Sequence, residues 1–401
     1  MAKKIFISCG ELSGEQHSAN LVEAIKKIDG HTTIYAMGSK LLEKAGAKLL
    51  IDYRDYSFSG FTEVIQNLSQ ILKLKDSIIE KLLKIRPDVV ILVDYAGFNL
   101  ELAKGIHEKF AKAGIQRPRI IEFIAPQIWA SRPWRINKIK KYIDKVLCTL
   151  PFEEEIYQEK NIPVEFVGNP VAASLRVKYD KASLYEELNI NADYKSEILI
   201  GLFPGSRKSE IQYMYPLMQK AALELNERNP LKNFRFLIAR APNLNEKVFE
   251  DFSLANEEEE DIQEDLITII DPESISSLNH KLLSTADCLW LCSGTVTLEA
   301  ALYEVPYFLA YKSTFINYIF YLIFRITKMA GLANIISGKY MVKEFLQYDA
   351  NVDNFVNETE NWLSGDGYSN YYYLIQENLH KLRKELQAKD TFNLVAQEAL
   401  L

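Results

Sequence analysis

The chain has 401 residues, of which 48% are hydrophobic, and a formal net charge of -7. This composition is typical of a globular protein with room for about two domains, and the negative charge disfavours a general nucleic-acid binder. The four cysteines, Cys9, Cys148, Cys288 and Cys292, form no Cys-x-x-Cys pair, which favours reduced, buried thiols of a cytoplasmic protein. Met1 leads straight into a predicted strand, so we expect no signal peptide.

The first half of the chain alternates short apolar segments with amphipathic ones. Helices are predicted from about His17, over 62–85 with Pro87 closing the segment, and over 100–113. Apolar strands are predicted at 4–9, 33–37, 89–93, 119–123, 145–149 and 164–167. Apolar strands separated by helices favour a parallel sheet that is covered on both faces.

The pattern restarts after Gly168-Asn169-Pro170, which we interpret as a domain exit, and a polar helical stretch to about 193. Strands are predicted at 198–203, 235–239, 266–270, 289–292 and 307–310, and the tail is helical over 368–401. We therefore predict an α/β protein of two Rossmann-like, doubly wound domains, 1–170 and 171–367, that face each other across a cleft, with ligands at the carboxyl ends of the strands. The helices of 368–401 are expected to pack on the N-terminal domain, as is common in this architecture.

Two junctions in the second half each run from an apolar strand through a small-residue turn into a helix. One reads Leu202-Phe203-Pro204-Gly205-Ser206-Arg207, and the other reads Leu291-Cys292-Ser293-Gly294-Thr295, with Glu299 one turn further on. A helix N-terminus carries free N–H groups and a partial positive charge, so it suits an anion. The two junctions indicate a phosphate-bearing ligand, for which Arg207 adds a cation and Glu299 an acceptor for sugar hydroxyls.

Several catalytic patterns are absent from the sequence. It holds no GxxxxGK[ST], GxSxG, HExxH or zinc-spaced Cys/His cluster. No Asp-x-Asp triplet occurs either, which disfavours a divalent metal that chelates a diphosphate. Neutralising a leaving diphosphate then falls to Arg207 and helix N-termini, and we expect no metal and no cofactor.

Two features of the first half point to further polar chemistry. The loop Gly10–Gly14 follows the first strand as a dinucleotide-binding loop would, but its GxxxG spacing also suits a plain strand–helix turn. Asp94 ends a strongly apolar strand, where a partly desolvated carboxylate with a raised pKa can act as a general base. The alternative for Asp94 is an ordinary turn or N-cap aspartate, and His17 is more simply a capping or core histidine than a catalyst.

The segment Phe315–Phe324 is apolar and aromatic almost all round, and it is shorter than the roughly 20 residues that a spanning helix needs. It is either a buried helix or a surface helix in the lipid interface, with Lys312, Arg325 and Lys328 at the headgroups. Residues 129–135 and the basic helix after them are a second candidate. They form either an aromatic, basic rim for an anionic amphiphile or a solvated helix face.

A series of motifs runs in one order from about residue 5 to residue 347. The motifs are Gly10-Glu11-x-Ser13-Gly14, Asp94 with Phe98-Asn99, Trp129 with Arg132-Pro133 and Arg135, Leu150-Pro151-Phe152-Glu153, Phe166-Val167-Gly168, Pro204-Gly205-Ser206-Arg207 with Glu210, Ser293-Gly294-Thr295 with Leu298-Glu299-Ala300, and then Asn334, Gly338 and Phe345-Leu346-Gln347. Together they resemble the lipid-A-disaccharide synthase family.

The resemblance implies an inverting glycosyltransferase of the two-Rossmann-domain (GT-B) type. Such an enzyme joins UDP-2,3-diacylglucosamine to 2,3-diacylglucosamine 1-phosphate (lipid X). The products are the β-1,6-linked lipid A disaccharide 1-phosphate, a precursor of lipopolysaccharide, and UDP. The family works without a metal at the cytoplasmic face of the inner membrane, and Phe315, Phe320 and Phe324 are the candidates for contact with that surface. The sequence leaves the oligomeric state open, a homodimer included.

The resemblance also implies roles for single residues. Asp94 matches the family's essential acid, and we expect it to take the proton of the acceptor's 6-hydroxyl group. The residues implied in substrate binding are Arg207 with Ser206 at the diphosphate, Ser293, Gly294 and Thr295 at the phosphates, Glu299 at the ribose, Gln347 at the donor sugar, Asn334 without an assigned role, and Gly10, Ser13 and Gly14 in a loop lining the acceptor side. The chain departs from the family at Glu15, where an aspartate is usual, and at Gly97, where a second aspartate is frequent.

Three other functions remain open at this point. A different UDP-sugar enzyme on the same fold, such as a UDP-GlcNAc 2-epimerase or the peptidoglycan glycosyltransferase, is the nearest one, although an epimerase would need no apolar surface segment. An NAD-dependent oxidoreductase is disfavoured by the missing GxGxxG pattern. In a non-catalytic nucleotide-binding or membrane-peripheral module, Asp94, Arg207 and Glu299 would be dispensable.

Overall fold

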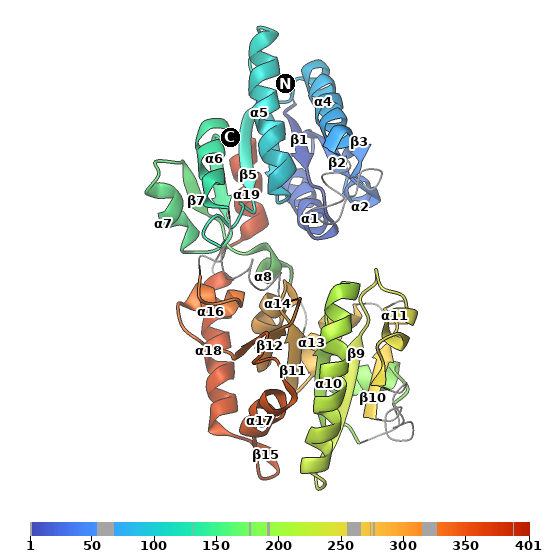
Figure 1. Ribbon diagram of the computed structural model, residues 1–401. Helices are drawn as coiled ribbons and strands as arrows, with labels where there is room; N and C mark the ends of the chain where they lie inside the picture. The colour runs from blue at the N-terminus through green and yellow to red at the C-terminus, as the bar shows by residue number, and fades with distance from the viewer. Residues whose placement is uncertain are drawn as a thin grey trace. The chain divides into compact units, whose positions relative to one another are not determined.

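The computed structural model describes residues 2–53, 68–130, 132–175, 178–190, 193–254, 266–272, 274–275, 277–314, 327–387 and 389–401. The chain divides into two compact units, each of which is an α/β domain (Figure 1). Unit 1 consists of Met1–Ser174 and Leu386–Leu401, and unit 2 consists of Leu175–Glu385.

Unit 1 is built on a seven-stranded parallel sheet with the spatial order β3-β2-β1-β4-β5-β6-β7. Its strands are β1 (Lys4–Ser8), β2 (Thr33–Gly38), β3 (Lys48–Asp52), β4 (Val89–Val93), β5 (Arg119–Phe123), β6 (Lys145–Cys148) and β7 (Val164–Phe166). Its helices before the chain enters unit 2 are α1 (Leu12–Ile28), α2 (Lys40–Lys44), α4 (Leu68–Ile85), α5 (Ala96–Lys112), the short 3-10 helix η2 (Pro133–Arg135), α6 (Ile136–Tyr142), α7 (Glu153–Gln158) and α8 (Pro170–Ser174).

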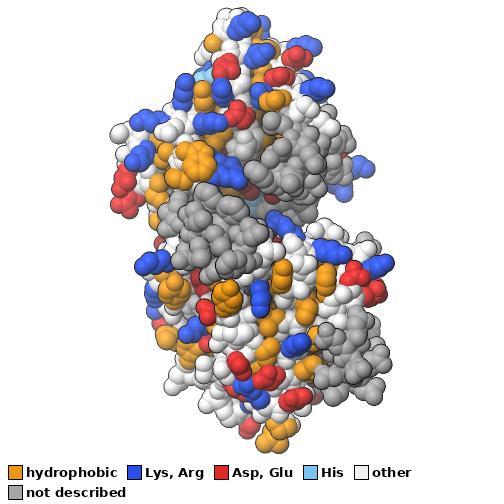
Figure 2. Space-filling model, in the orientation of Figure 1, with side chains coloured by type: hydrophobic (Ala, Val, Ile, Leu, Met, Phe, Trp, Pro, Cys, Tyr) orange, Lys and Arg blue, Asp and Glu red, His pale blue; other side chains and the backbone are white. Residues whose placement is uncertain are grey.

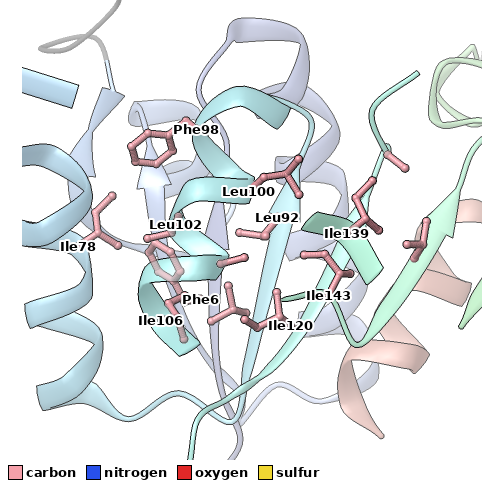
Figure 3. Close-up of a cluster of buried hydrophobic side chains, with 14 of the residues drawn as sticks. Phe6, Ile78, Leu92, Phe98, Leu100, Leu102, Ile106, Ile120, Ile139 and Ile143 are labelled. Carbon is pink, nitrogen blue, oxygen red and sulfur yellow. The ribbon is translucent and has the colours of Figure 1, made fainter. Parts of the chain in front are cut away.

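Helices bury both faces of this sheet. On one face, an apolar stripe of α5 packs against residues of β1 and β4, and α4 and α6 complete the cluster (Figure 3). The stripe consists of Phe98, Leu102 and Ile106, and it meets Phe6 and Leu92. A stripe at this spacing lies on one side of a helix. The packing therefore fixes α5, and with it the turn that joins β4 to α5.

Unit 2 repeats this architecture on a six-stranded parallel sheet with the order β10-β9-β8-β11-β12-β13. Its strands are β8 (Glu197–Phe203), β9 (Asn233–Ala239), β10 (Ile267–Ile270), β11 (Cys288–Cys292), β12 (Tyr307–Tyr311) and β13 (Glu344–Leu346), with a separate hairpin of β14 (Leu363–Ser364) and β15 (Gly367–Tyr368). Its helices are α9 (Lys181–Glu187), α10 (Lys208–Arg228), α11 (Lys247–Glu250), α13 (Leu278–Thr285), α14 (Val296–Tyr303), α16 (Leu332–Ser337), α17 (Val352–Trp362) and α18 (Asn370–Leu386).

The two C-terminal helices belong to different units, which corrects the expectation that both pack on the N-terminal domain. The last helix, α19 (Thr391–Leu400), places an apolar stripe against α1 and β5 in unit 1. In contrast, α18 is tied to unit 2, because the Tyr372 hydroxyl donates to the Asp287 carbonyl at 2.8 Å and Arg383 pairs with Glu304 at 3.1 Å. The sequence shows that both helices are amphipathic but not which sheet each apolar face meets.

The predicted fold class of two Rossmann-like α/β domains is confirmed, and the predicted strands are all present within a residue or two. The strands β3 and β13, which are half-buried edge strands of the two parallel sheets, were missed, and so were the two-residue hairpin strands β14 and β15. The aromatic segment Phe315–Phe324, the start of the helix predicted over 62–85 and the acidic stretch 257–261 lie outside the described residues. Among the helices that the structure describes, none has the length and apolarity required to cross a bilayer.

Candidate active site

The sheet order brings the predicted site residues together within each unit. In unit 1, β1 lies beside β4, and in unit 2, β8 lies beside β11. These are the points where the strand order reverses, and ligands of doubly wound sheets bind there, outside the carboxyl ends of the strands. The turns that leave these strands contain Gly10–Gly14 and Asp94 in unit 1, and Pro204–Arg207 and Ser293–Thr295 in unit 2. Each unit thus contains one candidate ligand site.

Asp94 follows β4 in a turn of unusual backbone geometry. Asp94 and Tyr95 are consecutive left-handed residues, with φ of 48° and 49°. Non-glycine residues in this region cost about 1–3 kcal/mol each and cluster at functional sites. The turn is held by the Asn99 side chain, which donates to the Asp94 carbonyl at 2.6 Å and accepts from the Ser8 hydroxyl at 2.7 Å.

The carboxyl group of Asp94 has the environment of a base. Asp94 is half-buried, and this burial raises its pKa, while a hydrogen bond from the Tyr95 backbone opposes part of the shift. Among the residues that the structure describes, Asp94 forms no ion pair. A carboxylate that is partly desolvated and not neutralised by a cation is a stronger proton acceptor than an exposed one. The geometry therefore suits removal of a proton from a hydroxyl group.

The predicted loop Gly10–Gly14 is largely the first turn of a helix. The sequence predicts a helix from about His17, whereas α1 begins at Leu12, so Ser13 and Gly14 are helical and Ser13 is exposed. A Cβ at Gly10 would lie 2.3 Å from the Tyr95 ring, and one at Gly14 would lie 3.8 Å from the Asp94 Cβ. The Tyr95 ring therefore leaves no room for a side chain at Gly10, whereas Gly14 is at an ordinary van der Waals distance from Asp94.

A buried acid, Glu122, lies next to this turn and was not predicted as a site residue. In the sequence it is only one acid within an apolar strand. Glu122 of β5 has no exposed surface, and neither of its carboxyl oxygens has a hydrogen-bond partner among the described residues. Burial raises the pKa of Glu122 well above its usual value, the charge of Asp94 adds to the shift, and Arg135 opposes it. Burial therefore favours the protonated form of Glu122, which lies on the strand beside the one that leads into Asp94.

We expect Glu122 to make the protein less stable as the pH rises. The pKa of Glu122 is higher in the folded protein than in the unfolded chain. Its contribution to the free energy of unfolding is therefore fully present below the ordinary glutamate pKa and is lost as the pH rises from there to the folded-state pKa. Glu122→Gln does not titrate, so its stability relative to the wild type should rise above roughly pH 5 by up to about 1.4 kcal/mol per pH unit. Urea unfolding at pH 5, 7 and 8.5 measures this, with Glu108→Gln on the exposed side of α5 as the control. A constant difference between Glu122→Gln and the wild type across this range would contradict it.

The first junction of unit 2 is organised by Glu210, for which no role was predicted. Glu210 in the first turn of α10 accepts the Ser206 backbone N–H at 2.9 Å and the Arg207 guanidinium at 3.3 Å. One of the N–H groups expected to be free for an anion is therefore already paired. The Arg207 side chain is 77% exposed and available to a ligand. The pairing of Arg207 with Glu210 could have been predicted from their spacing, because residues three apart on a helix are neighbours.

The second junction is more open. Gly294 and Thr295 are exposed, Ser293 is half-buried, and a Cβ at Gly294 would meet nothing within 4 Å. Glu299 lies in the first turn of α14, and its burial raises its pKa to about 7. The junction thus combines accessible backbone at a helix start with a carboxyl group that can accept hydrogen bonds or, when protonated, donate one.

Asn334 is buried, and its side-chain amide forms all of its hydrogen bonds within the protein. Its Nδ2 donates to the Val342 carbonyl at 3.0 Å and to Glu344 at 2.8 Å, and its Oδ1 accepts from the Met341 and Val342 backbone at 2.7 and 3.1 Å. These four contacts use both donors and both lone pairs of the amide. In this structure Asn334 holds the loop before β13, and its side chain has no further hydrogen bond to offer a ligand.

Gln347 is also engaged with the chain itself. It has a φ of 56°, its Oε1 accepts from the Ser313 backbone at 3.2 Å, and its Nε2 donates to the Ser313 carbonyl at 2.8 Å. Glu344, three residues earlier, accepts the backbone N–H groups of Ala330 and Gly331, both at 2.9 Å. Residues 344–347 therefore anchor the chain both before and after the segment 315–326.

Two further glutamates have structural partners: Glu153 in the shared motifs, and Glu15, where the chain departs from the family. Glu153 accepts from the Trp129 indole at 2.9 Å and from the Thr149 and Leu150 backbone, and burial raises its pKa to about 7. Glu15 is fully buried and accepts the backbone N–H of Ser39 at 2.6 Å and its hydroxyl at 2.8 Å. Glu153 fixes the Trp129 loop, and Glu15 fixes the start of α2.

The charges on the described surface are mixed. On the face shown in Figure 2, acidic and basic side chains are interspersed over both units. Within the described ranges, no group of three or more His, Cys, Asp or Glu side chains is arranged to hold a metal ion. Local cations such as Arg207, and not a broad basic surface on this face, are the groups available to an anion.

The chain is similar to known proteins of one family over nearly its whole length. The pattern of the lipid-A-disaccharide synthetase family matches residues 5–397. A curated relative, lipid-A-disaccharide synthase 1 of Legionella pneumophila (strain Paris), is 38% identical over 351 residues, which are 87% of this chain and 85% of the relative. The chain belongs to the lipid-A-disaccharide synthetase family.

Solved structures with the same fold are more distant. The UDP-GlcNAc 2-epimerase of Neisseria meningitidis, bound to UDP-GlcNAc, superposes with a TM-score of 0.58 at 13% identity, covering 100% of this chain and 99% of that one. The glycotransferase of kitacinnamycin superposes with a TM-score of 0.63 at 11% identity, covering 99% and 98%. Epimerases and transferases share this GT-B fold, so the fold does not separate these activities. Membership of the lipid-A-disaccharide synthetase family does.

Proposed function

We propose that this protein transfers a 2,3-diacylglucosamine unit from UDP-2,3-diacylglucosamine to the 6-hydroxyl of 2,3-diacylglucosamine 1-phosphate. The observation that carries the proposal is family membership over residues 5–397, combined with an acid and an arginine at the switch points of the two sheets. The reaction needs a base for the hydroxyl and a cation for the departing diphosphate, and Asp94 and Arg207 are of these two kinds.

In the proposed reaction Asp94 accepts the proton of the acceptor's 6-hydroxyl as its oxygen bonds to C1 of the donor sugar. The bond between C1 and the diphosphate oxygen breaks, and the electron pair leaves with UDP. Attack on the face opposite the leaving group inverts C1 and gives the β-linkage. Arg207, with the backbone at Ser293–Thr295, stabilises the charge that develops on the diphosphate. Glu299 accepts hydrogen bonds from the ribose.

The remaining predicted binding residues take supporting roles in this proposal. Asn334 and Gln347 hold the chain around β13, because their amides are already bonded to the loop before β13 and to Ser313. Gly10 allows the Tyr95 ring to pack closely on the turn after β1, and Gly14 lies in van der Waals range of Asp94. Ser13 and Ser206 remain candidates for direct contact with the acceptor and the diphosphate, respectively.

The product tests this assignment directly. After incubation with both substrates, mass spectrometry should detect a β-1,6-linked disaccharide 1-phosphate. Recovery of both substrates unchanged by a folded protein would contradict the proposal.

Because both substrates carry acyl chains, we propose that the protein works at the cytoplasmic surface of the inner membrane. Phe315, Phe320 and Phe324, which lie outside the described residues, are the candidate contacts. Phe320→Glu combined with Phe324→Glu should release the protein from anionic vesicles in a flotation assay, because charged side chains disfavour the lipid interface. The control pair is Ile28→Glu with Leu231→Glu, at leucine and isoleucine side chains that are already exposed. If the Phe320/Phe324 variant floats with the vesicles as the wild type does, those positions are not the membrane contact.

A further inference from the structure

One side chain, that of Glu210 in the first turn of α10, connects this helix to the turn Pro204–Ser206. The Glu210 side chain is 10% exposed, and its two carboxylate oxygens have different partners. Oε2 accepts the Ser206 N–H at 2.9 Å, and Oε1 accepts from Nη1 of Arg207 at 3.3 Å. A single carboxylate therefore connects the backbone of the turn to the guanidinium group.

Gly205 shows how closely the turn follows this side chain. Its φ is 125°, a conformation that other residues rarely adopt. A Cβ at this position would also lie 2.5 Å from the Glu210 Cβ and 2.7 Å from Oε2. The carbonyl of Ser206 is held from the other side by Asn243, which donates to it at 2.8 Å. Glu210 and Asn243 thus each hold the turn by a hydrogen bond to Ser206.

The pair of Glu210 and Arg207 also borders the second junction. Burial raises the pKa of Cys292, which ends β11, and of Tyr311, which ends β12; the charge of Glu210 adds to both shifts and that of Arg207 opposes them. Cys292 immediately precedes Ser293–Thr295. The two charges therefore act on the ends of both neighbouring strands, next to the second junction.

Arg207 needs such a partner. Its side chain is 77% exposed, and Glu210 is the one ion-pair partner that it has among the described residues. A long, exposed side chain loses rotamer freedom when it binds a ligand. A partner that already restricts the guanidinium group lowers this cost, whereas the negative charge of Glu210 by itself would repel a diphosphate.

We propose that Glu210 is a positioning residue that holds Arg207 and the Pro204–Ser206 turn in the arrangement that binds the diphosphate of UDP. The inference rests on the proposed function, in which Arg207 contacts this diphosphate. Glu210 acts through Arg207 and does not touch the ligand. Its contribution should therefore depend on the presence of the Arg207 side chain.

A double-mutant cycle on UDP affinity tests this dependence. Glu210→Gln retains an oxygen for the Ser206 N–H but no longer pairs with Arg207. Isothermal titration calorimetry should show UDP binding weakened about tenfold, as for loss of one charge-assisted contact. In the Arg207→Ala background the same change should alter the affinity less than twofold. Glu210→Asp, which keeps the charge but is shorter by one methylene group, should also weaken binding.

Each other outcome overturns the inference. Equal losses of UDP affinity in the wild-type and Arg207→Ala backgrounds would show that Glu210 acts on the fold and not through Arg207. Unchanged or tighter binding by Glu210→Gln would show that its charge only repels the ligand. Glu224→Gln is the control, because Glu224 lies on the same helix and pairs with Arg228 away from the turn. Thermal melting of each variant verifies folding. If the wild type itself does not bind UDP, the proposed function fails as well, so the two failures are distinguishable.

Discussion

Asp94→Asn is expected to retain UDP binding and to lose turnover by ~100-fold or more, the usual effect of removing a general base. The amide has the shape of the carboxylate but cannot take the proton of the acceptor's hydroxyl. Since Asp94 lies in unit 1 and the UDP-binding candidates lie in unit 2, UDP affinity should stay within twofold of the wild type. Steady-state turnover and calorimetric titration of UDP measure the two quantities separately.

The pH profile provides a second readout for Asp94. Burial raises its pKa, so in the wild type kcat/KM should fall with decreasing pH, beginning above the range of an exposed aspartate. Asp76→Asn, at an exposed position on α4, should leave both the rate and this limb unchanged. If Asp94→Asn turns over at a rate close to the wild type, Asp94 is not the base.

Arg207→Ala should weaken UDP binding by ~1.5–3 kcal/mol, the usual contribution of a hydrogen bond to a charged group. The side chain is the exposed cation at the β8–α10 junction, so its removal leaves only backbone N–H groups for the diphosphate. The affinity for uridine, which lacks phosphates, should not change. This difference distinguishes a lost diphosphate contact from a disturbed nucleoside site.

Arg228→Ala is the matched control for Arg207→Ala. Arg228 lies at the other end of α10 and pairs with Glu224 and Asp353, so its removal changes the net charge equally without affecting the junction. UDP affinity of Arg228→Ala should equal that of the wild type. Equal UDP affinities for Arg207→Ala and the wild type would exclude Arg207 from the diphosphate site.

Much of the fold could be predicted because the central strands are apolar on both faces. Val89–Val93 is buried throughout, and such a run between helices indicates a strand of a parallel sheet. The edge strands β3 and β13 were missed because their residues are mostly half-buried and lack this signal. The helices α1 and α5 begin earlier than predicted because Gly14 and Gly97 suggest turns. In the structure both glycines are inside helices.

Candidate site residues could be predicted where a charged residue stands at or just after the end of an apolar strand. Asp94 directly follows the apolar strand β4, and Arg207 follows the apolar strand β8 after the three-residue turn Pro204–Ser206. The partners of Asn334 and Gln347 could not be foreseen, because their amides bond to Val342 and Ser313 only once β12 and β13 are paired. Glu122 was missed because one acid in an apolar strand looks like an interruption of the pattern, whereas the sheet order puts it beside the strand that ends at Asp94.

UDP release measured with and without the acceptor tests most directly whether the protein transfers a sugar between two lipid-linked substrates. With UDP-2,3-diacylglucosamine and 2,3-diacylglucosamine 1-phosphate both present, UDP should appear in equal amount to the disaccharide product. Without the acceptor, UDP release should fall to background. Release at the same rate without the acceptor, or turnover of UDP-GlcNAc alone to its 2-epimer, would contradict the account.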